Sequence, residues 1–399
     1  METNKKNIPE IRFPEFMNDG EWLSAPLYEL IETITPTNKL QTSEYKPSGK
    51  YPIIDQSQKY IVAYSDSAEA LTNTGCSDTI VFGDHTCALK FVSFPFIQGA
   101  DGIKIFKSKD NNKIVTDYLY QYLSAFPIES KEYKRHFSEL KETLIKFPSD
   151  AIEQKRIAEC MESLERYTIQ TKVKLEQLKA HKKGLMQKLF PAPGKSAPEC
   201  RFKEFENAGE WKTFKLKDIA SFFKGKGISK TDVSDKAMTP CIRYGELYTT
   251  YNEVIETTKS YTNLPLSDLF LSKSNDIIIP SSGETAEDIA TASCILKDGI
   301  ALSGDINIIR TAHNGVFLAY YLTHVKNNDI ARKAQGVSII HLYNEQLQAL
   351  SIELPNYEEQ KRIADCLSSI DYTIRLYSNK LDILERHKQA LRQRLFPTI

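Results

Sequence analysis

The amino-acid sequence predicts a mixed α/β protein with an internal duplication, in which two globular domains are separated by a long antiparallel coiled coil of two helices. Three observations support this prediction. A segment with heptad periodicity occurs twice, at residues 150–191 and 356–397, with an offset of 206 residues over nearly its whole length. A shorter segment with a tryptophan opens each half, at residues 12–22 and 201–211. The interiors between these segments alternate short β-prone runs with turn signals.

The opening segments show how the duplication is organised. Arg12-Phe13-Pro14-Glu15-Phe16 returns as Arg201-Phe202-Lys203-Glu204-Phe205, and the two tryptophans of the chain, Trp22 and Trp211, follow at matching positions. The offset between these segments is 189 residues, so the second interior is longer by 17 residues (206 minus 189). The chain is therefore expected to be one unit used twice, with a shared opening, a divergent interior and a shared helix.

Strands and a helix are predicted in each interior. The β-prone runs lie at residues 79–82 and 103–106 in the first interior, and at 276–279 and 306–309 in the second. A helix is predicted before each coil, around residues 117–124 and 316–325. The predicted domain bounds are 1–149 for the first domain, 150–191 for the first long helix, 192–355 for a linker with the second domain, and 356–399 for the second long helix.

Both copies of the periodic segment carry the signals of a helix with defined ends. Asp150 with Glu153, and Asn356 with Glu359, form a capping-box pattern, in which two side chains satisfy backbone N–H groups at the helix start. Neither copy has an internal proline, and each stops at one. Spacings of four and three residues over more than four heptads indicate a coiled coil, with a long amphipathic helix on a larger core as the alternative. The seam positions are Ile157, Met161, Leu164, Thr168, Thr171, Leu175, Leu178, Lys182, Leu185 and Leu189, and then Ile363, Leu367, Ile370, Ile374, Tyr377, Leu381, Leu384, Lys388, Leu391 and Leu395.

Two lysines in the seam predict the direction in which the helices pair. Lys182 and Lys388 occupy the same heptad position, so a parallel pair in register would bring two ammonium groups together in the seam. In an antiparallel pair, Lys182 lies level with Asp371 and Lys388 lies level with Glu165. Each lysine can then lay its stem on an apolar neighbour and direct its ammonium group to a carboxylate. We therefore expect antiparallel helices, with the two halves related by a pseudo-twofold axis.

Bulk composition limits the class of protein without indicating a partner. Lys+Arg and Asp+Glu both number 52, so the net charge of zero gives no global electrostatic argument for nucleic-acid binding. Seven cysteines without paired CxxC spacing fit reduced thiols. Residues 1–10 lack the apolar core of a signal peptide, and no apolar run reaches membrane-spanning length. The chain is expected to be cytoplasmic.

No catalytic or cofactor motif is found in the sequence. The linker contains Gly194-Lys195-Ser196, but a phosphate loop needs a glycine five residues before Gly194, where Leu189 stands. Asp84-His85 has no partner spacing for a metal site, so a satisfied turn is the favoured interpretation. Ser281-Ser282-Gly283-Glu284 lacks the flanking glycines of a nucleophile elbow. The sequence therefore favours a binding protein without a metal or cofactor over an enzyme.

Polar segments in both interiors are candidates for contact with nucleic acid. Lysines can meet phosphates, while Gln, Arg, Glu and His side chains can read the edges of bases. The candidates are Gln56, Gln58, Lys59, His85 and Lys90 in the first interior, and Lys224, Lys226, Lys230, Arg243, Tyr244, Glu246 and Tyr248 in the second. For any one of these residues, ordinary solvated loop surface is the alternative interpretation.

Several of these segments together resemble a known family. The opening Arg-Phe-Pro-Glu-Phe with its following Trp, and Glu-Gln-Lys-Arg-Ile-Ala before a long heptad helix, occur in both halves. Further similar segments are Tyr51-Pro52-Ile53-Ile54, Gly83-Asp84-His85, residues 100–104 and residues 243–247. Over essentially the whole chain, this arrangement resembles the DNA-specificity subunit of type I restriction-modification systems.

The resemblance implies a function that the residues alone do not establish. It implies two target-recognition domains, each reading one half of a split site in double-stranded DNA, and helices that dock methyltransferase subunits, expected to number two. Restriction subunits that translocate DNA are possible further partners. Adenine methylation from S-adenosylmethionine and ATP-driven cleavage would belong to those other subunits. A duplicated protein-binding adaptor that assembles through its coil is the alternative function.

One departure from the family pattern concerns the end of the first interior. The second interior ends with Gln335-Gly336-Val337-Ser338, a Gly/Ser turn usual in the family. The first has Arg135-His136-Phe137-Ser138, without glycine, so its local backbone is expected to differ.

Overall fold

The computed structural model describes residues 7–35, 39–74, 78–99, 102–128, 135–334 and 340–397. The chain divides into two compact units: unit 1 comprises residues 1–172 and 379–399, and unit 2 comprises residues 173–378. This division cuts each long helix near its middle, whereas the predicted bounds separate the helices from the globular parts. The Gly/Ser turn predicted at residues 335–338 lies outside the described residues.

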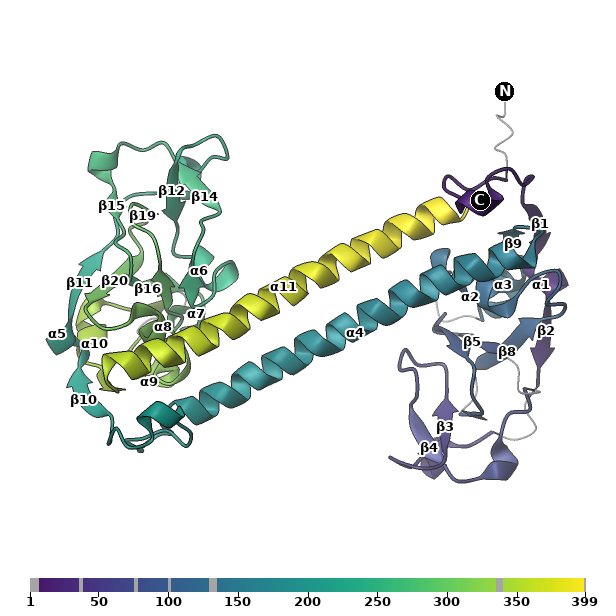
Figure 1. Ribbon diagram of the computed structural model, residues 1–399, viewed down its shortest axis with the longest axis horizontal. Coiled ribbons are helices and arrows are strands. Elements are labelled where there is room, and N and C mark those ends of the chain that lie inside the picture. The colour runs from purple at the N-terminus through teal and green to yellow at the C-terminus, as the bar shows by residue number, and fades with distance from the viewer. Residues whose placement is uncertain are drawn as a thin grey trace. The chain divides into compact units, whose positions relative to one another are not determined.

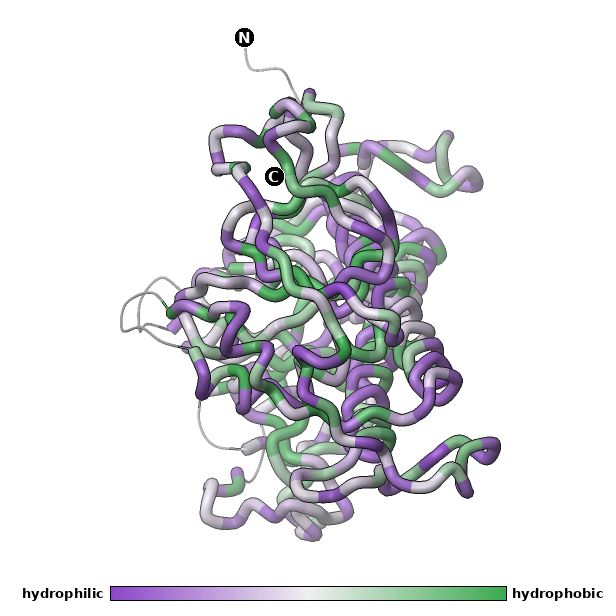
Figure 2. The backbone as a smooth tube through the Cα atoms, turned by 90° about the vertical axis from the view of Figure 1, so that its left-hand side faces the viewer, coloured by the Kyte–Doolittle hydropathy of each residue, from purple (hydrophilic) through white to green (hydrophobic). Residues whose placement is uncertain are grey.

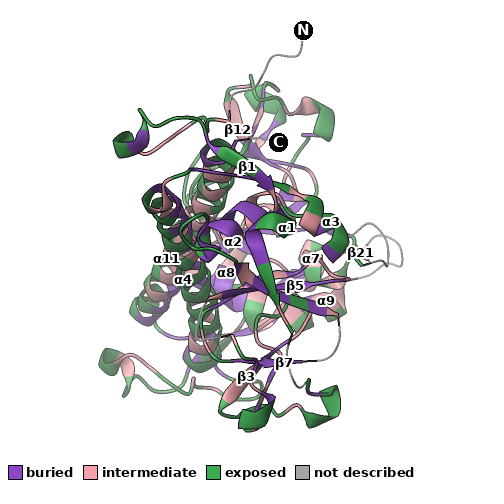
Figure 3. Ribbon diagram, turned by 90° about the vertical axis from the view of Figure 1, so that its right-hand side faces the viewer, coloured by how far each residue is buried: buried purple, intermediate pink, exposed green. Residues whose placement is uncertain are grey.

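Unit 1 is built on an antiparallel four-stranded sheet with a smaller sheet beside it. The large sheet has the order β2 (Ile31–Ile34), β8 (Ile103–Ser108), β5 (Thr79–Gly83) and β6 (Leu89–Val92). The small sheet has the order β4 (Ala63–Ser65), β3 (Tyr51–Ile54) and β7 (Ile97–Gln98), and β1 (Leu23–Pro26) pairs with β9 (Leu144–Phe147). The helices are α1 (Leu27–Leu30), α2 (Thr116–Ala125) and α3 (Phe137–Glu142), with 3-10 turns at Pro14–Phe16, Thr42–Glu44 and Ala68–Ala70. In Figure 3, β5 and much of α2 are buried.

Unit 2 repeats this plan with additional strands. Its large sheet has the order β11 (Ala220–Lys224), β20 (Ile306–Thr311), β16 (Ile277–Pro280), β18 (Ser293–Ile295) and β13 (Val254–Ile255). Its second sheet has the order β14 (Ser260–Thr262), β12 (Thr239–Ile242), β19 (Ala301–Leu302) and β15 (Phe270–Leu271). Two further pairs are β10 (Lys212–Lys215) with β22 (Ser351–Leu354), and β17 (Ser282–Gly283) with β21 (Ile340–His341). The helices are α5 (Leu216–Ile219), α6 (Glu246–Thr249), α7 (Ala286–Ile289), α8 (Gly315–His324), α9 (Asn327–Lys333) and α10 (Asn344–Gln348), with 3-10 turns at Lys203–Phe205, Lys230–Asp232 and Leu266–Asp268.

The two units share one topology, which confirms the predicted duplication and the mixed α/β class. The large sheets of the two units have matching strand orders, β2-β8-β5-β6 in unit 1 and β11-β20-β16-β18 in unit 2. The smaller sheets also match, with β4-β3-β7 in unit 1 and β14-β12-β19 in unit 2. Unit 2 adds β13 and β15 at sheet edges, in agreement with its longer interior. The hydrophobic residues of these strands lie inside the fold, and polar residues are concentrated in the loops (Figure 2).

The duplicated aromatic residues meet in the core of each unit. In unit 1, Trp22 lies edge-on to Tyr118 with ring centroids 6.0 Å apart, and Phe396 packs on Tyr118 at 5.8 Å. In unit 2, Phe190 packs on Trp211 at 6.4 Å. Each shared Leu-Phe-Pro ending is therefore an anchor that buries the end of a long helix beside the tryptophan of an opening segment.

The shared arginines and glutamates form buried ion pairs at the start of each long helix. Both Nε and Nη2 of Arg12 donate to the Glu153 carboxylate at 2.6 Å, and Arg201 binds Glu359 in the same bidentate way. The capping box was predicted to use these glutamates on the backbone, and this part of the prediction is wrong, because bidentate guanidinium bonds hold the carboxylates instead. Asn356 does accept a hydrogen bond from the Glu359 N–H at 2.9 Å.

The two long helices are α4 (Ala151–Leu189) and α11 (Tyr357–Leu395), and they lie side by side in each unit (Figure 1). In unit 1 the first part of α4 meets the last part of α11, where Lys388 Nζ lies 2.8 Å from Glu165 Oε2. In unit 2 the last part of α4 meets the first part of α11, where Lys182 Nζ lies 2.8 Å from Asp371 Oδ2. These contacts confirm the predicted antiparallel pairing, and all the predicted seam positions are buried or partly buried. Within the described part of the chain, no helix combines the length and apolar character needed to cross a membrane.

Candidate nucleic-acid interface

In unit 2, the two predicted contact segments converge on the turn at Ser303 and Gly304. The Lys226 N–H donates to the Leu302 carbonyl at 2.9 Å, and the Gly304 N–H donates to the Gly227 carbonyl at 3.0 Å. From the other segment, the Tyr244 N–H donates to Ser303 Oγ at 3.2 Å. The residues that follow β11 and β12 are therefore held side by side at one edge of the unit.

A close backbone approach explains the glycine between the two lysines. A Cβ atom on Gly225 would lie 2.0 Å from the Ser303 carbonyl oxygen, which no side chain can tolerate. The glycine lets the backbone pass against the turn, and the flanking Lys224 and Lys226 remain exposed. Lys226 Nζ donates to the Ser267 carbonyl at 3.3 Å, while Lys230 begins the following 3-10 turn and is exposed. These three lysines are placed where a phosphate can reach them.

Glu246 is buried and serves to orient Arg243. One Glu246 oxygen accepts the Arg243 backbone N–H at 2.8 Å, and the other accepts a hydrogen bond from Ser260 and lies 3.6 Å from the Arg243 guanidinium. Arg243 Nε is a buried donor without a hydrogen-bond partner among the described residues. In this structure Glu246 therefore positions the arginine and does not itself face outward.

The remaining predicted contact residues in unit 2 are two tyrosines. Tyr244 is exposed and Tyr248 is partly buried on α6. Burial raises the pKa of Tyr248, and the neighbouring Tyr244, Asp288 and Glu284 raise it further. The Tyr248 hydroxyl therefore stays protonated at neutral pH and can donate a hydrogen bond.

In unit 1, the predicted residues divide into exposed and internal ones. Gln58 and Lys59 are exposed, and His85 is partly buried in the turn after β5. The Gln56 amide lies against Gly102, which has a φ of +93° and would place a Cβ 2.7 Å from Gln56 Oε1. The Gln56 side chain thus packs on the neighbouring loop and does not point outward.

Lys90 was predicted to contact DNA, but the structure places its side chain in the interior. Its ammonium group donates to the carbonyls of Asp55 and Lys59, both at 2.7 Å, and only 4% of the residue is exposed. Burial lowers the pKa of Lys90, and the Asp55 carboxylate partly opposes this shift. The physical reason is that two loop carbonyls need a donor, so Lys90 fastens the loop that carries Gln58 and Lys59.

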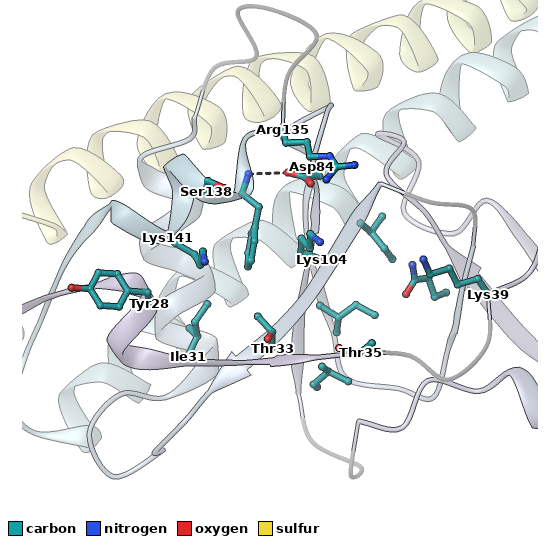
Figure 4. A pocket seen from close by; sticks show the side chains of 15 residues that line it. Tyr28, Ile31, Thr33, Thr35, Lys39, Asp84, Lys104, Arg135, Ser138 and Lys141 are labelled. Carbon is teal, nitrogen blue, oxygen red and sulfur yellow. Dashed lines mark hydrogen bonds between the residues drawn. The ribbon is translucent and has the colours of Figure 1, made fainter.

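The structure also shows a basic cleft in unit 1 that the sequence interpretation missed (Figure 4). It has a volume of about 570 Å³ and lies beside β2, the start of β8 and α3. Its cationic lining residues are Lys39, Lys104, Arg135 and Lys141. These residues come from separate segments, so no motif joins them, although alternation with Ile103 and Ile105 was a signal that Lys104 faces outward.

Unit 2 has a further polar pair that the sequence did not reveal. Ser282 Oγ lies 3.2 Å from His341 Nδ1, and the His341 ring stacks on Tyr343 at 6.2 Å. Among the described residues, no group of three His, Cys, Asp or Glu side chains could hold a metal ion.

A comparison with protein families identifies the family to which this chain belongs. The model of the type I restriction modification DNA specificity domain matches residues 20–180 and again residues 208–386. The chain belongs to this family. The resemblance seen in the sequence is thereby confirmed, together with the prediction that the chain is a non-catalytic specificity subunit, and DNA recognition is favoured over the adaptor alternative.

Individual members of the family agree with this assignment. The specificity subunit of the Escherichia coli type I restriction enzyme EcoR124I/EcoR124II is 26% identical over 381 residues, which cover 91% of this chain and 90% of that protein. The MjaVIII specificity subunit of Methanocaldococcus jannaschii is 23% identical over 47% of this chain and 42% of its own length. The crystal structure of the S subunit from M. genitalium has the same fold, with a TM-score of 0.68 and 15% identity over 98% of this chain and 99% of that one.

Proposed function

We propose that this chain selects the target of a type I restriction-modification complex, and that each unit reads one half of a bipartite DNA sequence. The observation that carries the proposal is a pair of equivalent sheet ends with different side chains. Because Ile54 pairs with Gln98 as Ile242 pairs with Leu302, the residues that follow β3 and β12 occupy equivalent places. Unit 1 has Asp55-Gln56 there, whereas unit 2 has Arg243-Tyr244.

Two domains that recognise different half-sites need the same scaffold with different side chains at equivalent places, and these two units have both. Donor and acceptor groups on side chains distinguish base pairs in the major groove, so different side chains at equivalent places select different sequences. In unit 2, Lys224, Lys226 and Lys230 would bind phosphates, and Arg243, Tyr244 and Tyr248 would lie near the bases. In unit 1, Gln58, Lys59 and His85 would contact the DNA, with Lys90 and Gln56 shaping the loop.

The partners we propose are methyltransferase subunits, two per specificity subunit, with restriction subunits as further members of the complex. The long helices offer surface for them, because large apolar side chains point outward on both. Tyr167 and Ile169 are exposed on α4 within unit 1, and Tyr372 and Leu376 are exposed on α11 within unit 2. We place this complex in the cytoplasm.

A domain exchange tests the proposal directly. Residues 38–140 are replaced with the equivalent residues of another specificity subunit, and the methylated sequences of cells are determined before and after the exchange. We expect one half of the methylated sequence to change while the other half stays the same. The matched control replaces the corresponding interior of unit 2 and should change the other half. A change in both halves after the first exchange would show that the units do not read independently.

A further inference from the structure

The basic cleft of unit 1 is an open feature lined by both apolar and polar side chains. Ile103, Ile105 and Phe137 line it from β8 and α3, and each of these side chains is largely withdrawn from solvent. Lys104 and Arg135 are exposed at its rim, and the Lys141 ammonium group lies 5.9 Å from the centre of the Phe137 ring. Figure 4 labels Lys104 on β8, Arg135 just before α3 and Lys141 on α3.

The charge in this cleft is not balanced by the acid that lines it. Asp84 is the acidic residue of the lining and is 4% exposed. Its Oδ1 atom accepts the Phe137 backbone N–H at 2.9 Å, so its charge is used to hold the start of α3. No described residue forms a hydrogen bond or ion pair with the Lys104 or Arg135 side chain. Lys104 and Arg135 are therefore two exposed cations at the cleft without a hydrogen-bond or ion-pair partner among the described residues.

The equivalent place in unit 2 is bridged by side chains instead. There the short helix before the last strand is α10, which corresponds to α3. Asn344 of α10 donates to the Phe223 carbonyl of β11 at 3.2 Å, and Asn307 of β20 donates to the Leu342 carbonyl at 2.8 Å. Neutral amides thus tie helix to strand where unit 1 leaves an open, cationic space. Among the described residues, the two units therefore carry different side chains at this place.

We propose that this cleft binds a phosphate group, and that Lys104 and Arg135 are its principal ligands. The guanidinium fork of an arginine matches two phosphate oxygens, and a lysine adds a point charge. The inference rests on the proposed function, in which the phosphate belongs to the DNA backbone. A free phosphate or mononucleotide offers the same chemistry.

The proposal predicts that loss of the cleft lysine and arginine weakens the salt dependence of DNA binding. Each phosphate that a cation neutralises steepens the plot of log Kobs against log salt concentration by about 0.9. The test compares the full chain, assembled with its methyltransferase subunits, with the double variant Lys104→Ala and Arg135→Ala. The matched control is Lys109→Ala with Lys113→Ala, which removes two exposed lysines beyond the other end of β8.

Binding to the duplex identified by methylome sequencing is measured by fluorescence anisotropy over a range of KCl concentrations. We expect the slope to become shallower by about 0.9 in the test variant, since the contact with one phosphate is lost, and to stay unchanged in the control. A second arm omits DNA and measures binding of inorganic phosphate to the full chain by calorimetry. Loss of phosphate binding in the test variant, with an unchanged DNA slope, would assign the site to a small phosphate ligand.

The outcomes separate this inference from the proposed function. If the wild-type complex binds the duplex but the test variant keeps both its salt slope and its phosphate binding, the cleft is not a phosphate site. If the wild-type complex does not bind its methylated sequence at all, the proposed function is wrong. In that case, the calorimetric measurement alone still tests whether the cleft binds phosphate.

Discussion

Lys182 and Lys388 have the same heptad position in the two copies of one helix, yet the units surround them differently. In unit 2, Lys182 Nζ lies 2.8 Å from Asp371 and 3.2 Å from Glu253, and it lies over the Tyr320 ring at 5.1 Å. Tyr320 donates to Asp371, and His324 is bonded to Glu253. The lysine thus joins both long helices to α8 and to Glu253, the residue before β13, in one network.

In unit 1, Lys388 has simpler partners. Its ammonium group lies 2.8 Å from Glu165 and 3.3 Å from Glu385, and these carboxylates are 41% and 53% exposed. The carboxylates around Lys182 are only 23% and 10% exposed. On α2, Gln121 and Ala125 stand where α8 has Tyr320 and His324. Among the described residues of unit 1, no strand takes the place of β13. The comparison teaches that a seam lysine is a stabilising centre only where the adjoining domain supplies buried partners.

The largest effect is expected at the ion pairs that the units share. Arg12→Met and Arg201→Met each leave a buried carboxylate, Glu153 or Glu359, without its bidentate partner. Each change should destabilise its own unit by about 4 kcal/mol, because an uncompensated buried charge remains. Each unit contains one tryptophan, so urea unfolding can be followed by fluorescence in a Trp22→Phe or Trp211→Phe background. Unequal losses for the two arginines would show that this part of the scaffold is not equivalent in the two units.

The next largest effect is expected at Lys182. Lys182→Met keeps the length of the side chain but leaves Asp371 and Glu253 without their shared cation, at a cost of about 3 kcal/mol to unit 2. The cost is smaller than for the arginines because Tyr320 and His324 still bond the two carboxylates. Urea unfolding followed at Trp211, in a Trp22→Phe background, measures it. A loss below about 1 kcal/mol would mean that the network contributes no more than a surface ion pair.

The acid response should also differ between the units. Burial tends to raise the pKa of Glu253, but the His324 hydrogen bond and the Lys182 charge outweigh it and lower the pKa from the usual 4.5 to about 2. A depressed pKa in the folded state stabilises the fold above pH 4.5, and this contribution is lost as the pH falls from 4.5 to 2. It corresponds to roughly 3 kcal/mol. Unfolding at Trp211 as a function of pH should show it, and Glu253→Gln should remove that part of the pH dependence. The same slope in the variant would assign the acid response to other carboxylates.

The smallest effect is expected at Lys388. Lys388→Met removes a cation whose partners are half exposed, so unit 1 should lose about 1 kcal/mol or less. Urea unfolding at Trp22, in a Trp211→Phe background, provides the measurement. A loss as large as that for Lys182→Met would remove the distinction between the two seam lysines.

The sequence by itself determined the repeated plan of the protein and the direction of its helices. Heptad spacing, proline stops and the matching segments are properties of the linear chain, so they can be recognised without knowing any distant contact. The antiparallel pairing could also be predicted, because Lys182 and Lys388 occupy the same heptad position. Only antiparallel helices place these lysines beside Asp371 and Glu165. Both predicted ion pairs are present, at 2.8 Å each.

Only the tertiary structure decided which polar residues face outward. Lys90 and Glu246 look like surface residues in the sequence, but both are buried. Lys90 donates to two loop carbonyls, and Glu246 accepts hydrogen bonds from a backbone N–H and a serine hydroxyl. Conversely, Lys104 and Arg135 lie far apart in the chain and meet at one cleft because β8 and α3 pack together. The partners of Lys182 before β13 and on α8 could not be predicted for the same reason. A side chain's exposure and its charge partners depend on which distant segments fold against it, and local sequence patterns do not record those contacts.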